Sequence, residues 1–253
     1  MTRAGKHKIC ESIDKEGEQL ENYTKYKLKE HDELVSVLAD KDNLFIIACN
    51  KCFKEFETID EPDCGEFEKI VAEQGKNVVG TAKVDFLCNK VQTEKKLQDM
   101  IPDGAENIFV ISCGLGIQTV ADLAGKPVFA ASNSLNYTGH HGMALTKKSC
   151  DACAQCYLNI TGGICPIVDC SKSLVNGQCG GAKNGKCEVD GEKDCAWEKI
   201  YRRLEKQGRL QEFLDQPVQV RDYSKVNFKV VQDYVKSIRE NRLDGYYGGV
   251  HPS

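Results

Sequence analysis

The sequence predicts an α/β protein, in which a Rossmann-like parallel sheet domain is followed by a small irregular cysteine-rich metal-binding domain and a helical tail. Short apolar strand patterns alternate with helical patterns up to about residue 145, and eight cysteines then crowd into residues 150–195. Alternating strands and helices imply a parallel sheet that is covered on both faces. We expect four parts: an N-terminal helical segment (1–40), the α/β domain (41–145), the cysteine-rich domain (146–200), and a helical C-terminal extension with a docking tail (201–253).

The individual elements follow from the spacing of apolar residues. Residues 13–40 are charged with spaced apolar positions, which favours surface helices. Four short apolar runs predict strands, and they begin at Leu44, Asn77, Asn107 and Pro127. Helical patterns occupy 64–74, 89–100, the stretch that opens at Gln118, 197–213 and 227–241.

Composition narrows the classes of partner. The formal net charge of −4 and the isoelectric point near 5.8 give no broad basic surface, so nucleic acid and anionic membrane are not expected partners. The longest apolar run, residues 44–49, is too short to span a bilayer. Because the amino-terminal residues show no export signal, we expect a cytoplasmic protein that binds another protein.

Fourteen cysteines are unusual in a chain from a reducing compartment, where thiols stay free of disulfides, so metal binding explains them best. Cys150, Cys153 and Cys156 have the C-x2-C-x2-C spacing that lets one loop place three thiolates on a cluster. A Cys-Pro pair follows at Cys165. The remaining members of this dense set are Cys170, Cys179, Cys187 and Cys195. Eight thiolates suffice for two four-cysteine iron–sulfur clusters.

Zinc is the competing interpretation of the dense set. Four thiolates also make a closed tetrahedral zinc site. Zinc ribbons usually show two C-x2-C pairs, however, and the second half of this set contains no such pair. The spacing therefore favours iron–sulfur clusters over zinc.

A second set of cysteines follows the predicted strands. Cys49, Cys88 and Cys113 each stand after a different strand. Because the carboxyl ends of parallel strands open onto one crevice, three distant stretches of sequence deliver three thiolates to one edge. Cys52 is the natural fourth ligand and Cys64 the reserve, although the alternative that these are ordinary buried cysteines stays open.

Other motifs carry less weight. Gly114 and Gly116 only partly match a dinucleotide fingerprint, and we interpret them as room for a cofactor near Cys113. The adjacent His140 and His141 more often belong to a solvated linker than to a metal site. No Ser-His-Asp set or carboxylate pair stands out, which argues against hydrolytic chemistry.

The cysteine-rich segment resembles a known family. The stretch from Gly163 to Val189, with its Cys-Pro and Cys-Gly-Gly, and the later Asp194-Cys-Ala-Trp resemble the methylenetetrahydrofolate reductase C-terminal domain family. Ala48-Cys-Asn-Lys-Cys and Ser112-Cys-Gly-Leu-Gly-Ile-Gln-Thr-Val are similar to the stand-alone small subunit of two-subunit reductases from acetogenic bacteria. This chain has Gln178 where the family usually has proline before Cys-Gly-Gly.

The resemblance implies a division of labour. The catalytic partner in that family is a flavin-carrying α/β barrel that reduces 5,10-methylenetetrahydrofolate to 5-methyltetrahydrofolate, and the small subunit carries iron–sulfur clusters, with zinc also attributed to such enzymes. The resemblance also implies that twelve cysteines of this chain are cluster ligands: Cys49, Cys52, Cys88, Cys113, Cys150, Cys153, Cys156, Cys165, Cys170, Cys179, Cys187 and Cys195.

Two functions of different classes follow. In the first, ferredoxin or another iron–sulfur subunit gives electrons to two or three [4Fe–4S] clusters in this chain, which relay them to the flavin of the partner. In the second, the chain is a zinc-stabilised structural or assembly subunit without electron transfer. The Tyr- and Gly-rich residues 245–252 are the expected docking tail.

Overall fold

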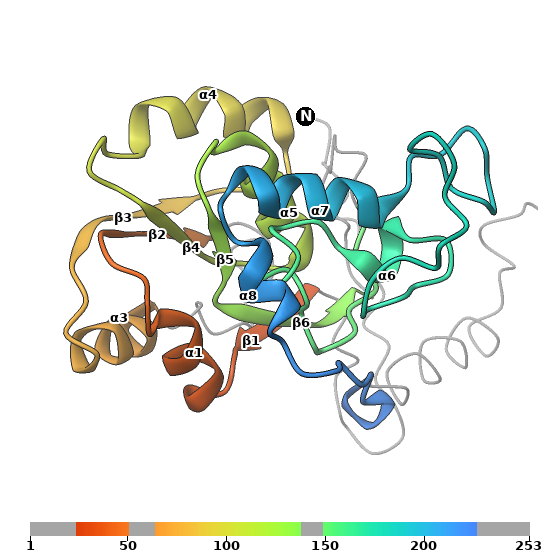
Figure 1. Ribbon diagram of the computed structural model, residues 1–253. Coiled ribbons are helices and arrows are strands. Elements are labelled where there is room, and N and C mark those ends of the chain that lie inside the picture. Colours follow the sequence, from red (N-terminus) through yellow and green to blue (C-terminus); the bar gives the residue numbers. More distant parts are fainter. Residues whose placement is uncertain (1–23, 51–63, 138–148, 227–253) are drawn as a thin grey trace, which may run out of the picture.

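The computed structural model describes residues 24–50, 64–137 and 149–226 (Figure 1). A four-stranded parallel sheet forms its centre, with strand order β3-β2-β4-β5. The strands are β2 (Leu44–Cys49), β3 (Val78–Val84), β4 (Asn107–Ile111) and β5 (Val128–Ala130). The α/β class and the parallel sheet expected from the sequence are confirmed.

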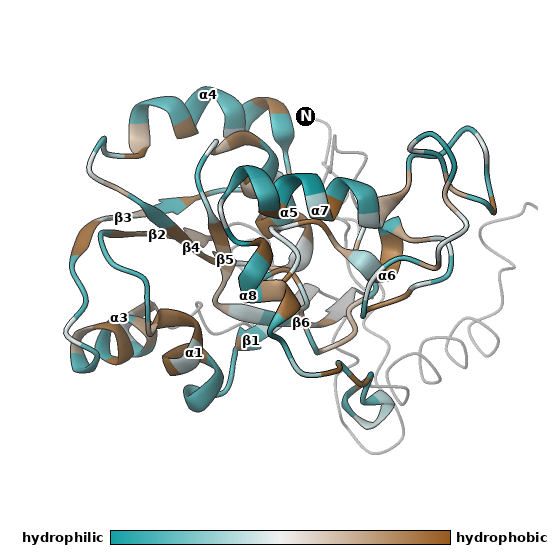
Figure 2. Cartoon of the chain, in the orientation of Figure 1, coloured by the Kyte–Doolittle hydropathy of each residue, from teal (hydrophilic) through white to brown (hydrophobic). Residues whose placement is uncertain are grey.

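Helices cover both faces of this sheet (Figure 1). Helices α1 (His31–Leu38) and α3 (Cys64–Glu73) pack on one face, and α4 (Lys90–Met100) and α5 (Gly114–Leu123) pack on the other. β2 is buried along its whole length, and Figure 2 shows the hydrophobic strands between the helices. Successive side chains of β2 point alternately into the two core clusters, one on each face of the sheet. The sequence of β2 is therefore a continuous apolar run.

The strand order places a topological switch point between β2 and β4. The chain passes from β2 outward to β3 and then returns across β2 to β4. In open parallel sheets the crevice at such a point, outside the carboxyl ends of the strands, is where ligands bind. Cys49 ends β2 and Cys113 follows β4, so both flank this crevice.

A second, two-stranded sheet joins distant parts of the chain. β1 (Thr24–Leu28) pairs antiparallel with β6 (Ser132–Tyr137). The expectation of helices throughout 13–40 is therefore wrong for residues 24–28, although α1 is helical and residues 13–23 lie outside the described part. Tyr26 and Leu28 are partly buried against the core, two residues apart as in a strand. The charged residues between and around them make this alternation hard to recognise in the sequence.

The cysteine-rich part contains little regular structure apart from α6 (Pro166–Asp169), as expected. Helix α7 (Ala196–Lys206) buries Trp197, Ile200 and Leu204 against it, at the spacing of one helix face. This hydrophobic cluster contains side chains from both sides of residue 200, the expected boundary between the cysteine-rich domain and the C-terminal extension. The division into four domains stays a prediction. The expected helix at 227–241 and the tail at 245–252 lie outside the described residues.

A glycine ends α7 and allows the chain to turn into α8 (Leu210–Leu214). Gly208 has a φ of 68°, and its N–H donates to the carbonyl of Glu205. The N–H of Arg209 donates to the carbonyl of Leu204. This is a Schellman motif, which caps the helix carbonyls. The helical pattern expected over 197–213 is thus confirmed, with a break at this glycine.

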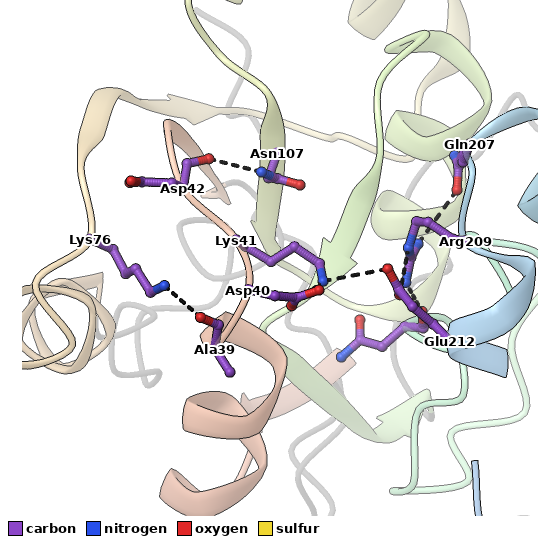
Figure 3. Close-up of polar contacts among 10 residues, drawn as sticks. Ala39, Asp40, Lys41, Asp42, Lys76, Asn107, Gln207, Arg209 and Glu212 are labelled. Carbon is purple, nitrogen blue, oxygen red and sulfur yellow. Dashed lines mark hydrogen bonds and ion pairs between the residues drawn. The ribbon is translucent and has the colours of Figure 1, made fainter. Parts of the chain in front are cut away.

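Arg209 ties α8 to the α/β core. Its guanidinium donates to the carbonyl of Asn159 at 2.7 Å, pairs with Glu212 at 2.9 Å, and stacks over the ring of Phe129 at 4.4 Å. Glu212 also pairs with Lys41 at 3.7 Å, beyond the end of α1 (Figure 3). This half-buried network fixes the C-terminal helices against the sheet.

In the described part of the chain, none of the helices combines the length and apolar character that crossing a membrane requires.

Candidate metal-binding site

The three cysteines that follow strands come together at the switch-point crevice. Cys88 and Cys113 pack in one buried cluster with Leu115, and their thiols lie close enough to Cys49 for all three to interact. Burial, and secondarily the thiols of Cys113 and Cys49, raise the pKa of Cys88 to about 12. We call these three residues the crevice set.

Tyr26 from β1 covers the crevice set. Its ring packs against the cluster that contains Cys88 and Cys113, and its hydroxyl donates to the carbonyl of Cys49 at 2.9 Å. The N-terminal strand thus shields these thiols from solvent, and low solvent exposure is one of the factors that set the potential of an iron–sulfur cluster.

Four cysteines of the dense stretch line a single cavity. They are Cys150, Cys153, Cys156 and Cys165, which we call the cavity set. The volume of the cavity is about 20 Å³. The thiols therefore close around a small space.

The cavity set is strongly desolvated. Burial raises the pKa of Cys156 to about 12, against the opposing effect of the Lys29 ammonium. Burial also raises the pKa of Cys165. Buried thiols stay neutral unless a cation compensates the thiolate charge, and metal coordination is the usual way that proteins provide it.

Two buried polar atoms at this cavity lack a partner among the described residues. They are the hydroxyl of Tyr157 and the side-chain oxygen Oε1 of Gln118, and both residues line the cavity. Buried polar groups are nearly always hydrogen-bonded, so an unpaired hydroxyl beside four thiols fits a bound group that accepts a hydrogen bond, such as a sulfide. The donor set and this hydroxyl both fit an iron–sulfur cluster.

Gly114 brings the crevice and cavity sets into contact. A Cβ at this position would lie 2.7 Å from Sγ of Cys150, so only glycine lets Cys150 pack beside the start of α5. At Gly116, a Cβ would lie 2.2 Å from Oγ of Ser112. The two glycines therefore accommodate the chain's own side chains, and α5 begins at Gly114, four residues before the expected Gln118.

The remaining four cysteines line a second cavity, in the irregular loops before α7. They are Cys170, Cys179, Cys187 and Cys195, which we call the loop set. The volume of this cavity is also about 20 Å³. The sequence supplied these eight cysteines as one dense stretch, and the structure divides them into two groups of four.

The loop set differs from the others in exposure and charge. Cys179 is exposed, and its Sγ lies 3.3 Å from Oε1 of Glu188, a carboxylate that also pairs with Lys172. The contact with the Ser171 hydroxyl and nearby backbone N–H groups lower the pKa of Cys187. Cys187 therefore forms a thiolate more readily than Cys88 or Cys156.

Not every candidate ligand joins a set. Cys64, the reserve ligand, begins α3 and packs against the core on the α1 face of the sheet. Cys52, His140 and His141 lie outside the described residues. Within the described ranges, no three His, Cys, Asp or Glu side chains converge closely enough to hold one metal ion.

Sequence reasoning missed two residues beside the cavity. Lys29 is buried, and its ammonium lies 3.2 Å from the carbonyl oxygen of Cys156. Tyr157 immediately follows Cys156 and reads as an ordinary aromatic residue. A buried lysine has no sequence signal, whereas an aromatic residue next to a cysteine motif could have been singled out.

The comparisons with known proteins concern the region that carries the cavity and loop sets. No curated protein and no solved structure matches the chain. Residues 129–224, which contain all eight cysteines of these two sets, match a family described as "Methylene-tetrahydrofolate reductase C terminal". This region is therefore similar to the C-terminal part of methylenetetrahydrofolate reductases.

Proposed function

We propose that this chain is an electron-transfer subunit of a methylenetetrahydrofolate reductase complex and that its cysteine sets hold two or three [4Fe–4S] clusters. One observation carries the proposal. Cysteines from separate stretches of the sequence come together in a crevice set of three and in two cavities that are each lined by four. Four thiolates are the usual ligand set of such a cluster.

The chain's own residues have three tasks in this proposal. The cysteines hold the clusters, Tyr26 and the sheet shield the crevice set, and Lys29 and Tyr157 place a charge and a hydroxyl at the cavity set. When bound, the clusters supply one-electron carriers. Hydrogen bonds, burial and nearby charge set the potentials of such clusters.

The partners in the proposal come from the family resemblance. Ferredoxin or another iron–sulfur subunit gives electrons singly, and the receiving partner is a flavin-carrying barrel that reduces 5,10-methylenetetrahydrofolate to 5-methyltetrahydrofolate. The match of residues 129–224 supports an association with this reductase. In the crevice set, Cys49, Cys88 and Cys113 would hold one cluster, with Cys52 as the fourth ligand.

A zinc-stabilised structural subunit is the second candidate. The loop set favours it locally, because Cys179 is exposed and a carboxylate, Glu188, stands beside it. Loops with few apolar side chains are often organised by a structural zinc ion. Zinc at the loop set is compatible with clusters at the other two sets.

The decisive experiment is metal analysis of the chain purified without oxygen. Iron, acid-labile sulfide and zinc are measured, and visible and electron paramagnetic resonance spectra are recorded before and after dithionite. Iron with equimolar sulfide and a bleachable visible band are expected. A colourless protein with zinc and no sulfide would exclude electron transfer.

Single variants then assign metal to each set. Cys113→Ser, Cys165→Ser and Cys187→Ser each remove one thiolate from a different set, and each should remove about one third of the metal if the sets are equally loaded. Cys64→Ser is the matched control, because Cys64 packs on the other face of the sheet. It should leave the metal content unchanged.

A further inference from the structure

The outer face of α7 is basic in a chain whose net charge is −4. Lys199, Arg202, Arg203 and Lys206 follow one another at the spacing that places them on one side of the helix, opposite the buried Trp197. Figure 2 shows the hydrophilic outer surface of α7. With Lys90 at the start of α4, these side chains line an open hollow of about 520 Å³.

Most acidic groups around this hollow are already paired. Asp122 accepts from Arg203 at 3.2 Å, and Glu198 accepts from Arg202 at 3.3 Å. Within the described residues, Lys90, Lys199 and Lys206 form no ion pair, and all three are exposed. The hollow therefore presents three exposed ammonium groups that form no ion pair among the described residues, although Asp194 lies near Lys199 in the adjoining hollow.

Residues that line the hollow or the hollow beside it are close in sequence to members of all three cysteine sets. Lys90 follows Cys88 of the crevice set by two residues, and Ile164, which also lines the hollow, precedes Cys165 of the cavity set. Cys195 of the loop set lines a smaller neighbouring hollow of about 200 Å³ together with Lys199 and Arg202. A carrier seated here would be near every site proposed to hold a metal.

We propose that this basic hollow, bounded by Lys90 and the outer face of α7, is the docking surface for an acidic one-electron carrier protein. The inference rests on the proposed function, because it gives the cysteine sets their electron donor. On docking, the carrier's cluster is oxidised by one electron and a cluster in this chain is reduced by one, and no bond or proton moves.

The lining favours a transient carrier over a permanent subunit. Interfaces between electron-transfer partners are small and polar, whereas permanent interfaces are larger and more hydrophobic. Complementary charge mainly accelerates encounter and orients the partners. Among the described residues, the most exposed large apolar side chains, Val218 and Val220, lie on the segment after α8 and do not line this hollow.

The test measures binding of an oxidised, acidic [2Fe–2S] ferredoxin to the anaerobically purified chain. The double variant Lys90→Glu/Lys199→Glu reverses two charges in the first turns of α4 and α7, where acidic residues favour helix formation, so folding is preserved. It should weaken binding about tenfold or more, and rising salt should weaken wild-type binding by a similar factor. Lys69→Glu, on the opposite face of the sheet, is the control and should change the affinity less than about twofold.

Three outcomes would overturn the docking surface. They are equal loss of affinity in the Lys69→Glu control, salt-independent binding, and displacement of ferredoxin by inorganic phosphate at constant ionic strength, which would indicate a small-anion site. The metal analysis separates this inference from the proposed function. Iron and sulfide with unchanged ferredoxin affinity in the double variant refute only the docking surface, whereas charge-sensitive binding by a chain without sulfide refutes only the electron relay.

Discussion

The buried ammonium of Lys29 lies 3.2 Å from the carbonyl oxygen of Cys156, 127 residues along the chain. Its side chain is 1% exposed and is also paired with Glu33, which is 45% exposed. The charge of Lys29 acts on the Cys156 thiol across this contact. A positive charge beside a cluster stabilises its reduced form, because reduction adds negative charge.

Lys29→Met should therefore lower the midpoint potential of the cluster at the cavity set, by an amount on the order of tens of millivolts. Glu33→Gln should raise it, because the opposing carboxylate is removed. Potentiometric titration followed by electron paramagnetic resonance measures both. Lys27→Met, which breaks only an exposed pair with Glu30, is the control, and shifts of the same sign in the Lys29 and Glu33 variants would contradict the charge effect.

Tyr157→Phe tests whether the cavity holds a hydrogen-bond acceptor. In the metal-free chain, removing an unpaired buried hydroxyl should leave stability unchanged or raise it by up to about 1 kcal/mol. In the loaded chain the same change should cost about 1 kcal/mol and lower the potential of the cluster, because a hydrogen bond to sulfur is lost. Denaturant titration of both forms measures the difference. Equal effects in the two forms would show that the hydroxyl does not contact a bound group.

Gly114→Ala should separate Cys150 from the start of α5. The added Cβ would lie 2.7 Å from Sγ of Cys150, and overpacking of this kind costs about 1–3 kcal/mol. We expect lower thermal stability and loss of metal from the cavity set. Gly104→Ala is the control, since its Cβ would have nothing within 4 Å. Wild-type metal content in Gly114→Ala would show that the position of Cys150 is not critical.

Arg203 should stabilise the chain far more than its neighbour Arg202. It donates to the carbonyls of Ala121 at 3.0 Å and Gly162 at 3.3 Å and so joins α5, the cysteine-rich loops and α7. Arg203→Met should lower the free energy of unfolding by about 1–3 kcal/mol. Arg202→Met breaks one exposed pair on the helix and should cost less than about 0.5 kcal/mol. Equal losses, measured by urea denaturation, would contradict the bridging role.

Removal of metal should expose the loops of the loop set to protease. These loops are rich in glycine, lysine and acidic residues, so the bound metal would supply much of their order. Brief trypsin digestion after removal of metal should cut at Lys183, Lys186 or Lys193. Lys95 and Lys96, within α4, should stay protected in both forms. Equal cleavage of the loops with and without metal would show that metal does not organise them.

The central sheet was predictable because its strands are locally encoded. The continuous apolar run at 44–49 marks a strand buried on both faces, and the crevice set followed from the rule that parallel strands end at one edge. β1 was missed because its strand character comes from pairing with β6, more than 100 residues away. The early start of α5 was missed because the reason for its glycines is contact with Cys150 and Ser112, which no local pattern reveals.

The division of the dense cysteines was also beyond local reasoning. C-x2-C-x2-C predicts that Cys150, Cys153 and Cys156 lie together, which their common cavity confirms. Cys165 joins them, whereas Cys170, only five residues later, lines the other cavity. The turn of α6 between these two cysteines separates them. A single helical turn of this kind leaves no distinctive cysteine spacing in the sequence.

Ser134 in β6 connects the crevice and cavity sets through hydrogen bonds. Its hydroxyl accepts from the N–H of Gly114 at 2.8 Å, next to Cys113, and its carbonyl accepts from the N–H of Ala154 at 3.0 Å, next to Cys153. One residue thus lies on a continuous path of covalent and hydrogen bonds between two sets of thiols. Such a path fixes the spacing of the two sets. In the proposed electron transfer, β6 would therefore provide a tunnelling route between the two clusters as well as pairing with the N-terminal strand.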